Sequence, residues 1–281
     1  MIQTVCVCGA GTMGSGIAQA MAQAGLYTIL YELNAASLEK AKTGIEQNLQ
    51  VLSEKKKISE GEKEKILNRI QFTNDIHHCL ADIIIEAIIE KPGAKIALFN
   101  QLAEINHSET VFATNTSSLS VTEIAEKIIN PRRVIGLHFF NPPTLMKLVE
   151  VVKTKFTDQQ TIGLILDLAK ETGKTAVICN DSPGFIVNRV ARPYYIESLK
   201  LMEEGIADFT TIDSLLEASG FKMGPFKLMD LIGNDINYTV SQSVYKQLNE
   251  PERLKPSVIQ KEKIEKGELG KKTGKGYYSY P

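Results

Sequence analysis

One histidine and one glutamate occupy the two arms of a segment that has the pattern of an apolar hairpin. Residues 134–140 predict a strand, residues 141–143 predict a turn, and residues 148–152 predict a second strand. If the hairpin is symmetric about its turn, His138 and Glu150 lie opposite each other. A buried carboxylate beside an imidazole fixes the tautomer of the ring and stabilises its protonated form, which suits a general base.

The hairpin by itself leaves a second interpretation open. In that alternative, His138 is a hydrogen-bonded histidine of the core and Glu150 is a solvated strand residue. The choice between a catalytic and a structural His138 depends on the elements around the hairpin and on whether a ligand site lies beside them.

Length and composition narrow the class of protein. A chain of 281 residues exceeds the usual size of one domain, which predicts two domains. The formal net charge of -1 argues against a nucleic-acid-binding footprint and against a polybasic protein surface that binds membranes. No apolar run approaches the roughly 20 residues that span a bilayer, and the N-terminus enters a strand without a basic segment, so neither a membrane span nor a secretory signal is expected.

The cysteines and histidines outside the hairpin predict no metal site. The four cysteines have no disulfide or metal-cluster spacing, which indicates a reduced, cytoplasmic protein. They are Cys6, Cys8, Cys79 and Cys179. His77, His78 and His107 lie in polar or loop-like positions and are expected at the surface.

A glycine-rich loop near the N-terminus predicts a dinucleotide site. Residues 2–8 have the pattern of a buried strand, residues 9–14 form a G-x-G-x-x-G loop that opens a helix, and residues 27–31 predict the next strand. The residues of the loop are Gly9, Ala10, Gly11, Thr12, Met13 and Gly14. The three glycines permit the tight turn, the approach of the pyrophosphate and close helix–strand packing, and the helix N-terminus receives the phosphates.

Glu32 ends the second strand and indicates which dinucleotide binds. Its carboxylate would accept hydrogen bonds from the ribose hydroxyls and repel a 2′-phosphate, and no arginine lies in the next few positions. These residues favour NAD over NADP. The alternative interpretation is an α/β module that binds no nucleotide.

The rest of the first half continues as alternating strands and helices, which predicts a Rossmann-like, doubly wound, mostly parallel sheet. We expect a long helix over residues 34–57 and a later one opened by a Thr157 cap. Ligands of such sheets bind beyond the carboxyl ends of the strands, where residues 88–90, residues 115–118 and His138 fall. The histidine and the nicotinamide could therefore share one crevice.

Residues 181–184 carry a proline and a glycine and predict the boundary between domains 1–182 and 183–281. Beyond it the chain predicts an all-helical C-terminal domain, including a helix capped by Thr210 and a single helix over residues 228–248.

Seven segments along nearly the whole chain carry glycines or chemically active residues in a fixed order. They are residues 9–19, 86–90, 115–119, 138–150, 181–189, 223–226 and 270–278. Together they resemble the L-3-hydroxyacyl-CoA dehydrogenase family, particularly its bacterial 3-hydroxybutyryl-CoA dehydrogenases.

This resemblance implies reversible, NAD-dependent oxidation of an L-(3S)-3-hydroxyacyl-CoA to the 3-oxoacyl-CoA, with a short chain such as 3-hydroxybutyryl-CoA expected. It implies that His138 is the catalytic base and Glu150 its partner, and that Ser117 and Asn188 contact the reacting end of the substrate. The family also implies a homodimer formed through the C-terminal helical domain.

Further residues match positions that surround the two ligands in the family. Those implied around NAD, beyond the glycine loop and Glu32, are Glu90, Lys95, Ser117, Asn141 and Lys272. In the basic run of residues 55–57, Lys57 is the residue implied to contact the coenzyme A moiety. The chain departs from the family at two places. It has Glu32 where many members have aspartate, and it has Lys91-Pro92-Gly93 after Glu90, where the family often has an asparagine or aspartate followed by a leucine.

Several alternatives stay open from the sequence. The scaffold also fits an NAD-dependent dehydrogenase of a free hydroxy acid or sugar acid, or a non-catalytic member of the family. Residues 55–57 could form only a solvated helix face, Asn188 could only satisfy a hydrogen bond at a domain interface, and Ser117 could only cap a turn.

Overall fold

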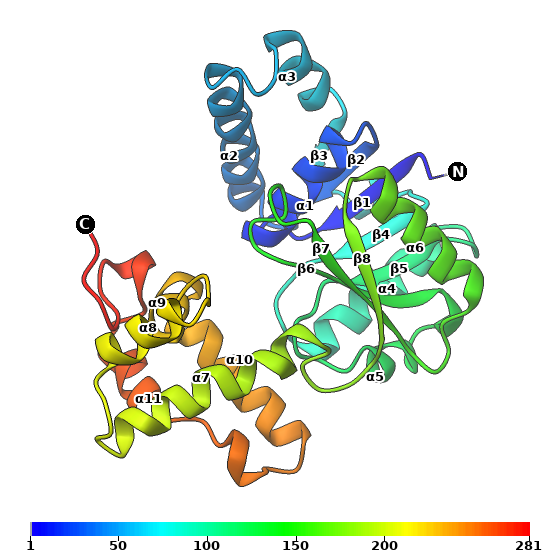
Figure 1. The fold of residues 1–281 in the computed structure, drawn as a ribbon. Coiled ribbons are helices and arrows are strands. Elements are labelled where there is room, and N and C mark those ends of the chain that lie inside the picture. The colour runs from blue at the N-terminus through cyan, green and yellow to red at the C-terminus, as the bar shows by residue number, and fades with distance from the viewer. Residues whose placement is uncertain (1) are drawn as a thin grey trace. The chain divides into compact units, whose positions relative to one another are not determined.

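The computed structural model describes residues 2–281, which divide into two compact units (Figure 1). The first unit ends at Asp181 and the second is Ser182–Pro281. The break between them falls one residue before the boundary expected from the proline and glycine of residues 181–184.

One eight-stranded sheet, in the order β3-β2-β1-β4-β5-β6-β7-β8, forms the centre of the first unit. The strands are β1 (Thr4–Cys8), β2 (Tyr27–Tyr31), β3 (Ile70–Thr73), β4 (Ile83–Glu86), β5 (Val111–Thr114), β6 (Val134–Phe139), β7 (Leu148–Lys153) and β8 (Thr175–Asn180). All neighbouring pairs are parallel except β6 and β7. The strand order turns back at β1, which lies between β2 and β4, so the ligand-binding switch point of a doubly wound sheet lies here. The predicted Rossmann-like, mostly parallel sheet is confirmed.

Helices cover both faces of this sheet, because its buried strands are apolar on both sides. The helices are α1 (Thr12–Gln23), α2 (Ala35–Glu54), α3 (Glu60–Leu67), α4 (Pro92–Ile105), α5 (Val121–Ala125) and α6 (Gln159–Glu171). On one face, Val5 and Val7 share a core with Ile17 of α1 and with α6. On the other, Phe99 of α4 packs edge-on against Phe112 of β5, with ring centroids 5.4 Å apart.

The first long helix, α2, is shorter than expected. Asn34 caps it as predicted, but the helix ends at Glu54 instead of continuing to Lys57. Lys56 adopts a left-handed φ of 53°, and the Lys57 amide donates to the Leu52 carbonyl, which together close the helix in a Schellman-type end. The basic run therefore lies in the turn between α2 and α3 and not on a helix face.

Two predicted threonine caps are wrong, because a neighbouring aspartate performs that function in each case. The Asp158 carboxylate accepts from the Thr161 amide at the start of α6, whereas the Thr157 hydroxyl donates to a strand carbonyl. In the second unit, Asp208 caps α8 in place of Thr210. A carboxylate is a strong acceptor for the amides of a first helical turn and also interacts favourably with the helix dipole.

The second unit is helical, as predicted, and is built around aromatic and aliphatic side chains that include Tyr195, Phe226 and Tyr277. Its helices are α7 (Val187–Glu203), α8 (Phe209–Ala218), α9 (Pro225–Ile232), α10 (Asn234–Gln247) and α11 (Val258–Glu265). The single helix expected over residues 228–248 is wrong, because Gly233 adopts a φ of 105° and separates α9 from α10. Within residues 2–281, no helix has both the length and the hydrophobicity that crossing a bilayer requires.

Candidate active site

The antiparallel pair β6–β7 places His138 directly opposite Glu150, as the symmetric hairpin predicted. The imidazole Nδ1 lies 2.7 Å from the carboxylate Oε2, and the two residues are only 6% and 1% exposed. Because an ionised carboxylate can only accept, Nδ1 carries the hydrogen and Nε2 is the nitrogen that can take up a proton. The pair therefore has the arrangement of a general base with a carboxylate partner.

Local sequence explains why the hairpin holds this register. Gly136 of β6 faces Val152 of β7, and a Cβ at Gly136 would lie only 2.7 Å from the Val152 Cβ, so glycine permits the close approach of the two strands. The Asn115 side chain accepts a 2.8 Å hydrogen bond from the Phe139 amide and ties the end of β5 to β6 beside His138. The apolar, buried faces of β6 and β7 then resist any slip that would expose them.

The turn of the hairpin, which carries Asn141, is also fixed from outside. The Lys174 ammonium donates to the main-chain carbonyls of Pro143 and Met146. Burial lowers the pKa of Lys174 below its usual value. Pro143 packs against the helix of the glycine loop, since a Cβ at Gly16 would lie 2.8 Å from its ring. Asn141 itself is exposed at the start of this turn.

The glycine loop fits a bound dinucleotide. A Cβ at Gly9 would lie 2.7 Å from the Ala87 carbonyl, and one at Gly14 would lie 1.7 Å from the Gly9 carbonyl, so both glycines are needed for packing. A Cβ at Gly11 would meet nothing within 4 Å, which leaves open space above the backbone. The helix α1 begins directly after Gly11, and the Thr12, Met13 and Gly14 amides of its first turn provide the donors that a pyrophosphate needs.

Glu32 lies just after β2, next to this loop. Its carboxylate accepts from the Ala10 amide at 3.0 Å and from the Asn34 amide at 3.1 Å. The carboxylate of Glu32 therefore lies against the glycine loop. This placement matches an acceptor for the ribose hydroxyls of NAD.

Lys95 and Glu90 lie together beside the loop that carries Ser117. The Lys95 ammonium is buried between Glu86 and Glu90, at 2.6 Å and 3.0 Å from their carboxylates. Glu90 in turn accepts from the Thr116 hydroxyl and from the Ser117 amide, the latter at 3.2 Å. The structure therefore brings together three of the residues implied around NAD.

Glu86 belongs to this group and was missing from the sequence-based candidates. Burial raises the pKa of its carboxyl group, and the charge and hydrogen bond of Lys95 oppose that rise. The sequence did contain a signal, because Glu86 is the single acid in the otherwise apolar strand β4 and is fully buried. A buried carboxylate at the carboxyl end of a central strand points to a function or to a partner.

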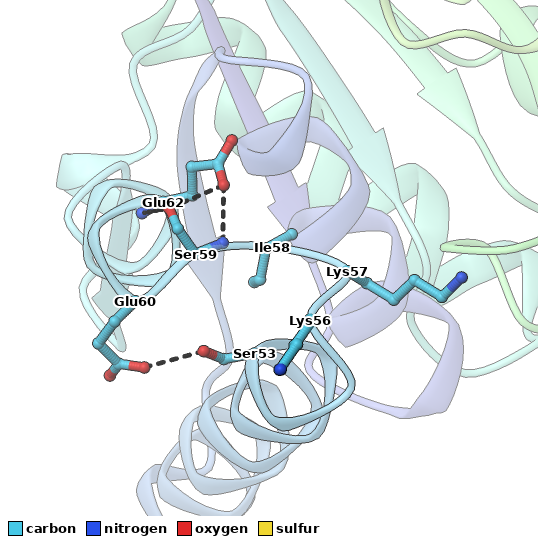
Figure 2. Close-up of a pocket in the computed structure, with 7 residues that line it drawn as sticks. All are labelled: Ser53, Lys56, Lys57, Ile58, Ser59, Glu60 and Glu62. Carbon is cyan, nitrogen blue, oxygen red and sulfur yellow. Dashed lines mark hydrogen bonds between the residues drawn. The ribbon is translucent and has the colours of Figure 1, made fainter.

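The basic run lies beside a small cavity of about 440 Å³ between α2 and α3 (Figure 2). It is lined by Ser53, Lys56, Lys57, Ile58, Ser59, Glu60 and Glu62. Ser53 donates a hydrogen bond to the Glu60 carboxylate, and the pKa of Glu60 is lowered, chiefly by its hydrogen bond from Lys63. Ser59 donates to the Glu62 carboxylate, and the pKa of Glu62 is lowered, chiefly by the hydrogen bond from the Ser59 amide. Lys56 and Lys57 make no ion pair with any residue among 2–281, so they are cations available to an anionic ligand.

Two of the candidate residues belong to the second unit. Asn188 lies in the first turn of α7, where its carbonyl accepts from the Arg192 guanidinium at 2.9 Å. The Lys272 ammonium contacts both carboxylate oxygens of Asp235, at 2.6 Å and 2.7 Å. His77, His78 and His107, by contrast, are in the first unit, where His77 and His78 belong to the short helical turn Ile76–His78.

These features define a class of protein. A doubly wound sheet with a glycine loop at its switch point, an acid at the end of β2 and a buried histidine–carboxylate pair at the end of β6 is typical of a dinucleotide-dependent oxidoreductase.

Comparison with known families identifies the group within this class. Residues 4–182 match the family model described as 3-hydroxyacyl-CoA dehydrogenase, NAD binding domain, and residues 184–280 match the C-terminal domain of the same enzymes. The chain belongs to the 3-hydroxyacyl-CoA dehydrogenase family. The predicted family and the predicted NAD-binding domain are confirmed.

Individual relatives agree with this assignment. The chain is 45% identical to 3-hydroxyadipyl-CoA dehydrogenase of Escherichia coli, over 99% of the chain but only 59% of that protein, so it spans about three-fifths of the length of this relative. It is 39% identical to a probable 3-hydroxybutyryl-CoA dehydrogenase of Bacillus subtilis, over 99% of the chain and 98% of the relative. The crystal structure of (S)-3-hydroxybutyryl-CoA dehydrogenase from Ralstonia eutropha matches with a TM-score of 0.95 and 34% identity, over all of both chains.

Proposed function

We propose that this protein catalyses the reversible, NAD-dependent oxidation of L-(3S)-3-hydroxyacyl-CoA to 3-oxoacyl-CoA, with short chains such as 3-hydroxybutyryl-CoA preferred. The observation that carries this proposal is the 2.7 Å contact between His138 and Glu150 within an NAD-binding domain of this family. The names of the relatives support an acyl-CoA substrate, and two of those described above are named for 3-hydroxybutyryl-CoA.

In the proposed reaction, His138 removes the proton of the substrate hydroxyl through Nε2. NAD, when bound, supplies the acceptor for the hydride that leaves C3. Glu150 stabilises the imidazolium that His138 becomes, because its buried carboxylate lies 2.7 Å from Nδ1. In the direction of reduction, the imidazolium returns the proton to the alcohol. Proton transfer of this kind typically contributes about 10²–10⁴-fold to a rate.

The remaining site residues bind and orient. We assign contacts with the reacting end of the substrate to Ser117 and Asn188. The cofactor contacts in the proposal are Gly9, Ala10, Gly11, Thr12, Met13, Gly14, Glu32, Glu90, Lys95, Ser117, Asn141 and Lys272.

Lys57 is the proposed contact for the coenzyme A moiety. Its support is positional and electrostatic, since it is exposed beside the cavity between α2 and α3 and makes no ion pair within residues 2–281. The phosphates of coenzyme A are the anionic groups that such a lysine would bind.

We also propose a homodimer that forms through the helical unit, and a cytoplasmic location. Leu215, Phe221, Leu231 and Ile236 of this unit are each half or more exposed, which leaves apolar area for a second copy to cover. A dimer predicts a mass in solution of about twice 31.0 kDa by light scattering, whereas a monomer mass would refute it. The four free cysteines suit a reducing compartment.

The function is tested by following NADH oxidation with acetoacetyl-CoA and, in parallel, with free acetoacetate. The proposal predicts turnover with the thioester, little with the free acid, and a preference for NADH over NADPH. Equal rates with free acetoacetate would indicate a dehydrogenase of free acids, and no rate with any acyl-CoA would indicate a non-catalytic protein.

A further inference from the structure

Three charged side chains form a chain of ion pairs that ends at the loop that carries Ser117. Glu86 at the end of β4 is 0% exposed and Lys95 of α4 is 1% exposed, whereas Glu90 between them in sequence is 37% exposed. The Lys95 ammonium contacts one carboxylate on each side, at 2.6 Å from Glu86 and 3.0 Å from Glu90. The cluster therefore links the core of the sheet to its surface through one cation.

Glu86 is held rigidly at the inner end of this chain. Its carboxylate accepts from the Ile88 amide and from the Thr114 hydroxyl, each at 2.7 Å, as well as from Lys95. Every one of these partners is a donor. Glu86 is thus fixed by β4, β5 and α4 together, and it can serve as an anchor for the lysine.

Glu90 makes the contacts at the outer end. Its Oε1 accepts from the Thr116 hydroxyl, from the Ser117 amide at 3.2 Å and from the Ser118 hydroxyl at 3.4 Å, while its Oε2 contacts Lys95. The position of Glu90 therefore sets the conformation of residues 116–118, which lie at the carboxyl end of β5, where the cofactor of a doubly wound sheet binds.

We propose that Glu86 is a positioning residue of the cofactor site, which acts through Lys95 and Glu90 on the loop of residues 116–118. The fully buried Glu86 takes up part of the charge of Lys95, so that Glu90 can direct one carboxylate oxygen to the loop. If the charge of Glu86 is removed, the buried ammonium has Glu90 as its remaining carboxylate, and it draws that carboxylate away from the loop. The inference rests on the NAD-binding part of the proposed function and not on the identity of the acyl substrate.

The variant that tests this is Glu86→Gln, which keeps the size of the side chain and removes its charge. The amide that replaces the carboxylate can still accept from Lys95 and donate to the Thr114 hydroxyl, so the fold should be retained. NADH titration by fluorescence should give a Kd about tenfold higher than that of the wild type, the factor that the loss of a charge-assisted hydrogen bond implies. The matched control is Glu217→Gln, which removes the carboxylate of the Glu217–Lys227 ion pair in the second unit and should leave the Kd unchanged.

Amide hydrogen exchange of the protein without cofactor separates a local effect on this loop from a change in the stability of the whole protein. In Glu86→Gln, the amides of residues 116–118 should exchange faster, while exchange in α6 stays as in the wild type. A variant with a lower Tm but wild-type exchange in this loop and a wild-type Kd would show that Glu86 is only structural. If Glu86→Gln does not fold, Glu86→Asp is the second variant, because it keeps the charge but moves it away from Lys95 by one methylene. Unchanged loop exchange and NADH affinity in Glu86→Asp would overturn the proposal.

A double-mutant cycle with Glu90→Gln tests the route of the effect. If Glu86 acts through Glu90, adding Glu86→Gln to Glu90→Gln should raise the Kd for NADH by less than twofold further. If the two effects multiply, Glu86 does not act through Glu90 and the proposal is wrong. If the wild type shows no turnover with acyl-CoA, the proposed substrate is wrong but the NADH-binding results still test the role of Glu86. Failure of the proposed function and failure of this inference can therefore be distinguished.

Discussion

The Nδ1 atom of His138 lies 2.7 Å from the Oε2 atom of Glu150, across adjacent positions of β6 and β7. Both residues are almost fully buried, although a carboxylate in the core is costly unless it is paired and hydrogen-bonded. The hydrogen bond to His138 satisfies this carboxylate, and the pair lies at the carboxyl end of a strand in an NAD-binding domain. That placement argues for chemistry over packing.

Replacing Glu150 by glutamine should slow the reaction without disrupting the hairpin. An amide has nearly the same shape as the carboxylate but cannot balance the charge of the imidazolium. The value of kcat should therefore fall at least about tenfold, which is less than the loss of about 10²–10⁴-fold expected when the base itself is removed. A wild-type kcat in a folded Glu150→Gln protein would separate Glu150 from the mechanism.

Two alanine substitutions in the glycine loop should have different effects. Gly11→Ala places a Cβ in open space, so the free energy of unfolding should change by less than about 0.5 kcal/mol, while NADH affinity falls because the methyl occupies the path of the pyrophosphate. Gly14→Ala drives a Cβ to 1.7 Å from the Gly9 carbonyl and should destabilise the protein by more than about 2 kcal/mol. Denaturant unfolding and NADH titration of both variants check this. Normal NADH affinity in a folded Gly11→Ala protein would contradict the assigned cofactor loop.

Lys57→Ala should weaken the binding of the coenzyme A moiety alone. The KM for acetoacetyl-CoA should rise about threefold to tenfold, as expected for one lost phosphate contact, while kcat stays within twofold. A truncated thioester that ends at pantetheine lacks the nucleotide phosphates and should show no change. Lys55→Ala, in the same basic run, is the matched control. An equal rise in KM for Lys55→Ala would mean that the positive charge of the whole basic run, and not a specific contact of Lys57, causes the effect.

The thiol of Cys179 on β8 should report the charge of Glu150. Burial, followed by the charges of Glu150 and Asp181, raises the pKa of Cys179 to about 11. The thiolate is the reactive form, so at pH 8 only about one thiol in a thousand is reactive and labelling should accelerate about tenfold per pH unit up to the pKa.

Removing the negative charge by Glu150→Gln lowers the pKa of Cys179 and should speed its labelling at pH 8 about threefold, as a nearby unit charge would. Mass spectrometry of the labelled peptide, with Cys179→Ser as the control, assigns the signal. An unchanged rate would contradict an ionised Glu150.

The sequence predicted those parts of the site that depend on local patterns. The glycine loop requires particular residues at fixed spacing, and the hairpin register follows from the turn at residues 141–143, so the pairing of His138 with Glu150 could be anticipated. The predicted helix starts were less accurate where two neighbouring residues could both act as the N-cap, as Thr157 and Asp158 could at α6.

Contacts between distant elements could not be predicted in the same way. The partners of Glu86 come from β5 and α4 and from the chain after its own strand, and no short motif states that they meet. The break at Gly233 was missed because an isolated glycine within a helical pattern is often tolerated, and only the positive φ shows that the helix stops there.

The most direct test of the central claim is the turnover of His138→Gln with acetoacetyl-CoA and NADH, measured together with its Kd for NADH. If His138 is the general acid and base of the reaction, kcat should fall about 10²–10⁴-fold while the Kd for NADH stays within twofold of the wild-type value. A folded His138→Gln protein with near-normal kcat would contradict the account.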